Sequence, residues 1–390
     1  MRDGWKEISL EDLETSGVIK LGRGDVISKK DMEADPGPNP VYSSAENKNG
    51  MIGKYDKFMF DEELITWSVD GGGHIFYRPK HKFSVTNIGG WLRILDDKVF
   101  SYQFLTYALQ RLHKQHSFDW QHKAHPSVIR KLYTRIPLPS LPEQKRIVDL
   151  ISSVDSYIEA LQQQLESAKR SRNAVLHELL TAGGDDWVET TLGEVVSVVN
   201  GGTPSTKSED YWGGSIVWIT TTELTAFDGK RVNSSKRTIT VEGLRNGPAR
   251  LVRAGTTLVG TTATIGTCAL ADCELTFNQQ ISGLIPLDKD LDDSYLFYWI
   301  QHIKYILEGL SAGTSFKRIS TSVLKTVSIN FPPIGEQKRI AAVISEMDEF
   351  LESIQRTSIE AKNLRSGLLS DLLSGTHEIP ASYDKVIGAA

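Results

Sequence analysis

Ile136-Pro-Leu-Pro-Ser-Leu-Pro-Glu-Gln-Lys-Arg-Ile147 returns later in the chain as Ile329-Asn-Phe-Pro-Pro-Ile-Gly-Glu-Gln-Lys-Arg-Ile340. The copies lie 193 residues apart, and the match continues without a gap for about forty positions. The segment that starts at Trp5 also resembles the segment that starts at Trp187, although here the offset is 182 residues. Repetition at this scale predicts a tandem plan of globule, helix, globule and helix, with about eleven more residues in the second copy.

Each copy of the repeat predicts a long helix. Prolines before the Glu-Gln-Lys-Arg motif end a strand and favour the start of a helix. Apolar residues then recur at alternating spacings of four and three, which is the seam of a coiled coil. The seam residues are Ile147, Ile151, Val154, Ile158, Leu161 and Leu165, then Ile340, Ile344, Met347, Leu351 and Ile354. A helix of about 40 residues is about 60 Å long.

Arg172 and Arg365 interrupt the two seams at the same heptad position. The favoured interpretation is a register shift near each helix end, with Leu176 and Leu364 taking over the seam. Glycines at 183, 184 and 375 are typical helix C-caps. We expect the two helices to pair antiparallel and to act as a spacer between the globules.

The fold class predicted is α+β, with two mixed α/β globules in tandem, two long helices pairing as an antiparallel coiled coil, and pseudo-twofold symmetry. Short β-rich runs bounded by glycines, such as residues 215–222 and 255–262, indicate strands in the globules. The predicted limits are 1–140 and 184–333 for the globules, 141–183 and 334–376 for the helices, and 377–390 for a tail.

Composition is that of an ordinary globular protein. The formal charge is −5, so a DNA-binding role needs local clusters of positive charge. No apolar run predicts a membrane span or a signal peptide, and we expect a cytoplasmic protein. The two cysteines, Cys268 and Cys273, are too few for a disulfide framework or a zinc site.

The repeated Pro-rich lead and Glu-Gln-Lys-Arg-Ile motif resemble those of the specificity subunits of type I restriction–modification systems. Further stretches that resemble the family lie in the second globule, at Gly201–Thr206, Tyr211–Thr220, Thr264–Gly266, Phe277–Ile281 and Gly313–Ile319. The first globule differs, because it has Gly22-Arg-Gly24 where the second has Gly201-Gly-Thr-Pro. Its stretches Gly53–Asp56, Asp70–Gly73 and Trp120–His125 resemble another subtype of recognition domain.

The resemblance implies that each globule is a target-recognition domain that reads a few base pairs in the major groove of double-stranded DNA. Unlike globules imply an asymmetric, bipartite target, with its gap set by the helices. The implied partners are two adenine-N6 methyltransferase subunits, which bring S-adenosylmethionine, and restriction or translocase subunits, which bring ATP and magnesium. No cofactor is expected on this chain.

Candidate DNA-binding residues in the first globule lie between residues 111 and 135, where six basic residues face one acid, Asp119. Arginine, lysine and glutamine suit phosphates and base edges. A solvated helix face explains the charges equally well, and no ligand spacing accompanies the histidines, which disfavours a metal site. The candidates are Arg111, Lys114, His116, Gln121, His122 and Lys123.

The second globule carries seven basic residues and one acid between residues 230 and 253. Hydroxyls beside a basic pair at 314–318 predict a phosphate-binding loop. The amides at 278–280 could read adenine, or could equally cap a strand end. The candidates are Thr203, Lys236, Arg237, Asn278, Gln279, Thr314, Ser315, Lys317 and Arg318.

Three stretches resemble catalytic motifs but do not match them. In residues 201–208, Thr206 stands where a phosphate-binding loop needs a glycine before its lysine. Asn330–Ile334 has the wrong order for an adenine methyltransferase signature, and Glu360 and Lys362 would lie on different faces of a helix. We therefore expect a non-catalytic subunit.

The alternatives are the specificity subunit of a type II-like system with catalysis on a partner chain, and a coiled-coil scaffold whose globules bind protein.

Overall fold

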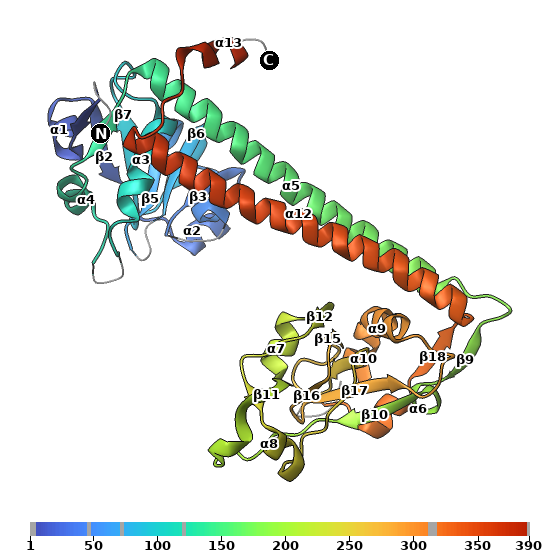
Figure 1. The fold of residues 1–390 in the computed structure, drawn as a ribbon. Helices are drawn as coiled ribbons and strands as arrows, with labels where there is room; N and C mark the ends of the chain where they lie inside the picture. The colour runs from blue at the N-terminus through green and yellow to red at the C-terminus, as the bar shows by residue number, and fades with distance from the viewer. Residues whose placement is uncertain (1–4, 45–47, 71–73, 119–121, 311–317, 388–390) are drawn as a thin grey trace. The chain divides into compact units, whose positions relative to one another are not determined.

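The computed structural model describes the chain except for residues 1–4, 45–47, 71–73, 119–121, 311–317 and 388–390. It divides into two compact units (Figure 1). Unit 1 comprises residues 1–162 and 356–390, and unit 2 comprises residues 163–355. Each unit therefore holds one globule and parts of both long helices, α5 (Leu141–Thr181) and α12 (Ile334–Ser374). The domain limits predicted from the repeat are not tested by this division.

Unit 1 is built on a mixed sheet whose described strands run in the order β2-β7-β5-β6-β3-β4. A separate antiparallel pair joins β1 to β8. The strands are β1 (Lys6–Ile8), β2 (Ile19–Arg23), β3 (Asn39–Tyr42), β4 (Met51–Tyr55), β5 (Phe60–Ser68), β6 (Ile75–Val85), β7 (Gly89–Ile94) and β8 (Ile136–Leu138). The helices of the globule are α1 (Leu10–Thr15), α2 (Lys29–Ala34), α3 (Tyr102–His113) and α4 (Pro126–Leu132).

Unit 2 contains a sheet in the order β10-β17-β14-β15-β12, a smaller sheet β13-β11-β16 and the pair β18-β9. Its strands are β9 (Val188–Thr191), β10 (Val196–Asn200), β11 (Trp212–Ile219), β12 (Lys230–Val232), β13 (Thr238–Ile239), β14 (Thr257–Gly260), β15 (Cys268–Ala271), β16 (Leu275–Phe277), β17 (Ile281–Pro286) and β18 (Ser328–Phe331). Its short helices are α6 (Leu192–Val195), α7 (Thr221–Ala226), α8 (Val241–Asn246), α9 (Asp293–His302), α10 (Lys304–Leu310) and α11 (Thr321–Lys325).

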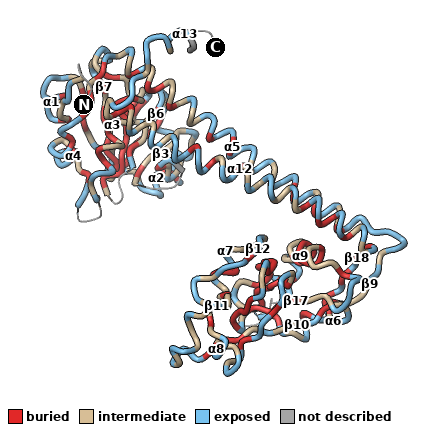
Figure 2. The backbone as a smooth tube through the Cα atoms, viewed as in Figure 1, coloured by how far each residue is buried: buried red, intermediate tan, exposed pale blue. Residues whose placement is uncertain are grey.

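The start of each long helix packs with the end of the other. In unit 1 the core contains Ile147 and Ile151 of α5 together with Leu372 of α12. In unit 2 the core contains Leu176 of α5 together with Ile344 of α12. The antiparallel pairing and the mixed α/β globules are as the sequence predicts. Buried residues concentrate in the globules, and much of the middle of each long helix is exposed (Figure 2).

The predicted seam residues are buried to different degrees. Those with buried side chains are Ile147, Ile151, Ile158, Leu161, Ile340, Ile344 and Ile354. Val154, Leu165, Met347 and Leu351 are half-buried. The two predicted C-caps hold, because Gly183 and Gly375 have φ angles of 69° and 73°, in the left-handed region that favours glycine.

The interpretation of the seam arginines as a register shift is wrong for α12 and holds only in part for α5, where Leu176 is buried as expected but Arg172 stays in the interface. Arg172 donates two hydrogen bonds to the carboxylate of Asp348, at 2.8 and 3.0 Å, and its side chain is 9% exposed. Arg365 forms the same bidentate pair with Asp155, whereas Leu364 remains 66% exposed and does not take over the seam. Each arginine stays in the helix interface because a carboxylate of the opposite helix neutralises it.

The glutamine of each Glu-Gln-Lys-Arg motif fastens its long helix to its globule. Gln144 is fully buried, donates to the carbonyls of Val99 and Pro139, and accepts from the amide of Ser101. Gln337 repeats these bonds with equivalent residues of unit 2, namely Asp290, Pro332 and Asp292. The glutamine of the repeated motif therefore has a structural role, since it is buried and makes no contact with solvent.

Candidate nucleic-acid interface

The turn between β16 and β17 organises the polar surface of unit 2. Asn278, which is 8% exposed, accepts a hydrogen bond from the amide of Gln280 and donates to the hydroxyl of Thr221, at 3.1 and 3.2 Å. These bonds close the turn, so the side chain of Asn278 caps the strand end here. That the amides at 278–280 read adenine stays a prediction.

Gln279 is presented to solvent at the tip of the same turn, where it accepts from the hydroxyl of Thr203 at 2.6 Å. The loop that carries Thr203 lies tight against the turn. A Cβ on Gly201 would lie 2.1 Å from the carbonyl oxygen of Asn278, and one on Gly202 would lie 2.4 Å from that of Pro248. Both positions require glycine, because Gly201 lies against the backbone of the turn and Gly202 lies against the backbone at Pro248.

Arg318 joins the same surface through backbone hydrogen bonds. The amide of Thr261 donates to the carbonyl of Gln280, and the amide of Ile319 donates to the carbonyl of Thr261. Arg318, directly before Ile319, pairs with Thr262 in an isolated bridge and has an exposed side chain.

A cation on an aromatic platform extends this surface. The guanidinium of Arg237 lies 3.7 Å from the ring centre of Trp212, which packs edge-on against Trp218. Trp218 donates through its indole nitrogen to the carbonyl of Gly202. Such stacking holds a guanidinium flat while leaving its donors available. The local cluster of positive charge predicts Arg237 but not the two tryptophans, whose only signal in the sequence is their place in the stretch that resembles the family.

Lys236 is held beside α7 by Glu223. The carboxylate of Glu223 accepts from the amide of Lys236 and also from Thr220 at the N-cap of α7. Burial opposes ionisation, but these hydrogen bonds outweigh it and hold the pKa of Glu223 below its ordinary value. Thr203, Lys236, Arg237, Asn278, Gln279 and Arg318 thus belong to one connected region, which we call the turn face of unit 2.

Unit 1 repeats this plan with different residues. Its glycine loop ends β2, and a Cβ on Gly24 would lie 1.9 Å from the carbonyl oxygen of Val85. The turn after β6 exposes Asn87, whose carbonyl accepts from the guanidinium of Arg23. Arg23 and Asn87 were not among the residues singled out from the sequence. Asn87 is found through the fold, because it occupies the place of Gln279. Arg23 occupies the place of Asn200, since the amides of Gly24 and Gly201 donate to the equivalent carbonyls of Gly89 and Ile281.

The same two-step backbone link also recurs. The amide of Val69 donates to the carbonyl of Ile88, and the amide of Ala124 donates to the carbonyl of Val69. Lys123 directly precedes Ala124, as Arg318 precedes Ile319. Lys123 and Arg318 therefore occupy equivalent positions, one in each turn face, although the sequences around them differ. Lys123 differs in one respect, since its ammonium lies 3.0 Å from the carboxylate of Asp70.

The other candidates of unit 1 are spread over its surface. Arg111 donates to the carbonyl of Leu373 at 2.8 Å, which ties α3 to the end of α12. Lys114 is exposed just after α3, and the ring of His116 stacks on Tyr133. His122 is exposed beside Lys123. Gln121, Thr314, Ser315 and Lys317 lie outside the described residues.

Acids distant in sequence neutralise much of the basic run at residues 111–135. Besides the Lys123 pair, Arg130 lies 2.5 Å from Glu14 and Arg135 lies 3.8 Å from Glu7. The sequence count of six cations against one acid therefore overstates the positive charge of this region.

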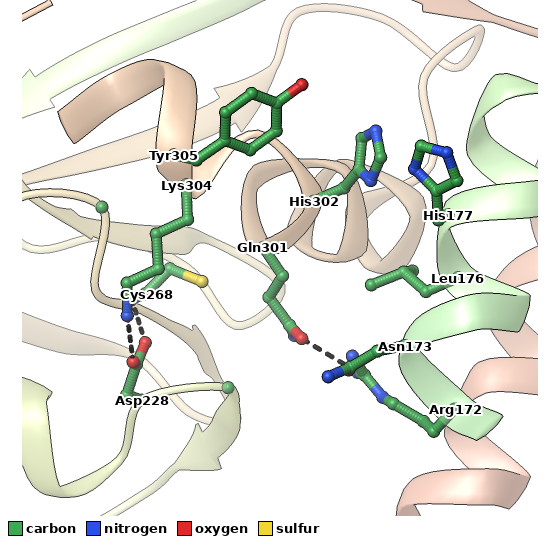
Figure 3. Close-up of a pocket in the computed structure, with 12 residues that line it drawn as sticks. Arg172, Asn173, Leu176, His177, Asp228, Cys268, Gln301, His302, Lys304 and Tyr305 are labelled. Atoms are coloured by element: carbon green, nitrogen blue, oxygen red, sulfur yellow. Dashed lines mark hydrogen bonds and ion pairs between the residues drawn. The ribbon is translucent and has the colours of Figure 1, made fainter. Parts of the chain in front are cut away.

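A hollow of about 550 Å³ in unit 2 lies beside α5, α9 and α10 (Figure 3). Its cations are already paired, Arg172 with Asp348 and Lys304 with Asp228 at 2.6 Å. Burial, and then the neighbouring His177, lower the pKa of His302. With its charges balanced and without any residue of the turn face in its lining, this hollow is separate from the candidate interface.

Within the described residues, no cluster of three or more histidine, cysteine or acidic side chains could hold a metal ion. The same residues contain no helix long and apolar enough to cross a membrane.

Comparisons with known proteins agree with the repeated plan. A family model described as type I restriction modification DNA specificity domain matches residues 2–170 and again 184–363. The MjaIX specificity subunit of Methanocaldococcus jannaschii is 34% identical over 170 residues, covering 43% of this chain and 39% of that protein. The putative MjaX subunit of the same organism is 24% identical, over 62% of this chain and 59% of its own length. The MjaVIII specificity subunit is 23% identical, over 96% of this chain and 93% of that one.

Two solved structures share the fold. An S subunit of a type I restriction–modification system from M. genitalium has a TM-score of 0.59 at 15% identity, covering 95% of this chain and 97% of that one. A structure from work on assembly and conformational transition of the type I system has a TM-score of 0.62 at 16% identity, with coverage of 96% and 98%. Because the family model matches both halves and most of its length, this chain belongs to the type I restriction–modification DNA specificity family.

Proposed function

We propose that the chain reads an asymmetric, bipartite DNA target, one half-site with each turn face, on behalf of catalytic partner subunits. The observation that carries this proposal is the equivalence of the two turn faces. Each has a glycine loop, a polar turn and a basic residue held by the same backbone link, but the exposed residues differ between units. A shared scaffold with different exposed side chains is what reading two different half-sites requires.

The partners proposed are two adenine-N6 methyltransferase subunits and restriction or translocase subunits. S-adenosylmethionine, ATP and magnesium would be bound by those partners and not by this chain. The chain itself would be non-catalytic and cytoplasmic. The support for this part is the family membership together with the failure of each catalytic motif in the sequence.

Exchange of one globule tests the two-reader proposal. Residues 5–135 are replaced by the first globule of a relative with a known target, and methylated adenines are mapped in cells that also express the partner subunits. We expect one half of the target to change and the other half to stay. If both halves change, the units do not read independently.

Assays of the purified chain test the non-catalytic proposal. DNA methylation, DNA cleavage and ATP hydrolysis are measured for the chain alone and after addition of the partner subunits. We expect activity only in the second case. Methyl transfer by the chain alone would contradict the proposal.

A further inference from the structure

The corners at which the two long helices begin are built from equivalent residues. In unit 1 the corner comprises Trp5, Glu143 and Arg146, together with Leu372 from the end of α12. In unit 2 the equivalent residues are Trp187, Glu336 and Arg339, together with Leu179 from the end of α5. Equivalent side chains in equivalent places are expected to bind similar partners.

The chain's own C-terminal tail fills the corner of unit 1. Ile379 packs against the core of the unit beside Trp5, and the space that remains is about 10 Å³. Five residues later, Asp384 accepts two hydrogen bonds from Arg146, at 2.8 and 3.0 Å. As a result the side chain of Arg146 is only 13% exposed.

The corner of unit 2 is open. It forms a groove of about 630 Å³ that is lined on one side by Pro332 and Pro333 and includes Trp187, Leu179 and Arg339. The side chain of Arg339 is 76% exposed and contacts Glu336 in the preceding turn of its own helix. An exposed pair of this kind contributes little to stability, which leaves the guanidinium available for another carboxylate.

Chain connectivity explains the difference. After α12 ends at Ser374, the tail is free to fold back over the corner of unit 1. After α5 ends at Thr181, the chain has only residues 182–187 before it enters β9 at Val188. This link lines the groove with Ala182, Gly183 and Asp186, but it carries no aliphatic side chain as large as Ile379 that could fill it.

We infer that the groove of unit 2 binds a segment of a partner protein that resembles the tail, with an aliphatic side chain followed five residues later by a carboxylate. The aliphatic side chain packs on Trp187 and Leu179, and the carboxylate pairs with Arg339. The occupant comes from another protein because the tail of this chain already fills its own corner in unit 1. This inference rests on the proposed function only in requiring that the chain works with partner subunits.

A peptide with the sequence of residues 376–387, labelled at its N-terminus, is the probe. Fluorescence anisotropy is measured with the full chain. We expect a dissociation constant on the order of 100 µM, because the contact is short and partly exposed. Arg339→Glu should weaken binding about tenfold or more, whereas Lys338→Glu makes the same charge change at an exposed neighbour and should not. A peptide carrying Asp384→Arg should regain affinity for the Arg339→Glu chain.

Several results would overturn the inference. The first is absence of binding at about 1 mM peptide, and the second is equal binding to the Arg339→Glu chain. Loss of binding with Arg146→Glu but not with Arg339→Glu would show exchange with the tail in unit 1 instead. Circular dichroism of each variant checks that it is folded.

Crosslinking in the assembled complex tests the identity of the occupant. A photoreactive residue replaces Asp186, which lines the groove and is exposed. We expect a crosslink to a partner subunit that is lost when Arg339→Glu is added. A crosslink to a second copy of this chain would overturn the assignment to a partner. Because the peptide assay contains no DNA, its outcome is independent of whether the chain reads DNA.

Discussion

Gln144 and Gln337 show how one buried amide can determine where a long helix leaves its globule. Each carboxamide joins three backbone groups from the segments around the start of its helix. Backbone groups that are buried without a partner cost free energy, so the identity of this residue is tightly constrained. The neighbouring Lys145 and Lys338 are exposed and carry no such constraint.

Replacement of Gln337 by alanine should therefore destabilise unit 2. We expect a loss of about 2–4 kcal/mol in the free energy of unfolding, because one amide and two carbonyls lose their partners. Urea denaturation followed by tryptophan fluorescence measures it. Gln164→Ala, at an exposed position of α5, is the matched control and should change stability by less than about 0.5 kcal/mol. Equal effects of the two substitutions would contradict this role.

Lys123 and Arg318 occupy equivalent positions but should contribute unequally to DNA binding. Arg318→Ala should weaken binding to target and non-target DNA alike and flatten the salt dependence by about one counterion. Lys123→Ala should flatten it less, because Asp70 already neutralises part of that charge. Binding is measured over a range of salt concentrations. Arg231→Ala, which removes an exposed arginine paired with Asp272, serves as the control.

Arg318→Ala could instead abolish discrimination at one base pair and leave the salt dependence of the DNA affinity unchanged. In that case the residue contacts a base and not a phosphate. That result would place the phosphate contacts of unit 2 elsewhere in its turn face.

We expect His113 to make the stability of unit 1 depend on pH. Burial, and then the nearby His74 and His116, lower its pKa to about 4 from an ordinary value of 6.5. The unfolded chain therefore takes up this proton at a higher pH than the folded chain does. Stability is full above about pH 6.5 and falls as the pH drops towards 4, by up to about 3 kcal/mol. His113→Phe should remove this slope in urea denaturation at pH 7 and pH 5. An unchanged slope would assign the effect to other groups.

At the scale of elements, the two Arg–Asp pairs hold the long helices in one register. The residue numbers add to 520 in both pairs, 172 with 348 and 155 with 365, as a single antiparallel alignment requires. Both arginines also lie near a tyrosine ring of the adjacent globule, Tyr298 or Tyr107. Each pair therefore joins two helices and the globule of its own unit.

Loss of one partner should be more harmful than loss of both. Arg172→Met leaves Asp348 facing an apolar interface and should cost about 3 kcal/mol or more in the free energy of unfolding. Arg172→Met with Asp348→Leu should recover part of this loss. The equivalent substitution Arg365→Met should cost less, because its side chain is 24% exposed against 9% for Arg172. A double-mutant cycle by urea denaturation measures the coupling, and additive effects would exclude it.

The long helices could be predicted from sequence because their signal is local. Heptad spacing and the glycine caps lie within each element, and the repeat shows them twice. The role of Arg172 could not be predicted, because Asp348 is 176 residues away and only the fold brings the two together. From the sequence alone, an arginine at a seam position predicts an interruption of the apolar seam, because its acidic partner cannot be identified without the fold.

The turn faces could be predicted only in part. Composition pointed to Thr203, Arg237 and Gln279, which lie in one region, because turn and basic residues cluster locally. The equivalence of Lys123 with Arg318 was hidden, because the links that create it run through backbone carbonyls of Val69 and Thr261. Backbone hydrogen bonds leave little trace in the sequence, so the first globule resembled a recognition domain of another subtype.

At the scale of the whole molecule, the spacer hypothesis makes the length of the helices, not the globules, responsible for the gap between half-sites. A fair test must lengthen both helices, since an insertion in α5 alone would break the register that the two Arg–Asp pairs share. Leu161 and Ile354 are equivalent positions of the repeat, next to the boundary between the units. Four residues inserted after each keep the apolar stripe roughly in phase and preserve both pairs.

This double insertion adds about 6 Å of helix, close to two base pairs at about 3.4 Å each, and about 40° of rotation. We expect both half-sites to keep their sequences and the gap between them to lengthen by one or two base pairs. Mapping methylated adenines in cells with the partner subunits gives both quantities at once. The matched control is the four-residue insertion after Leu161 alone, which should lower stability because it forces one Arg–Asp pair out of register. If the double insertion leaves the gap unchanged while methylation persists, the helices are packing elements and the spacing is set elsewhere.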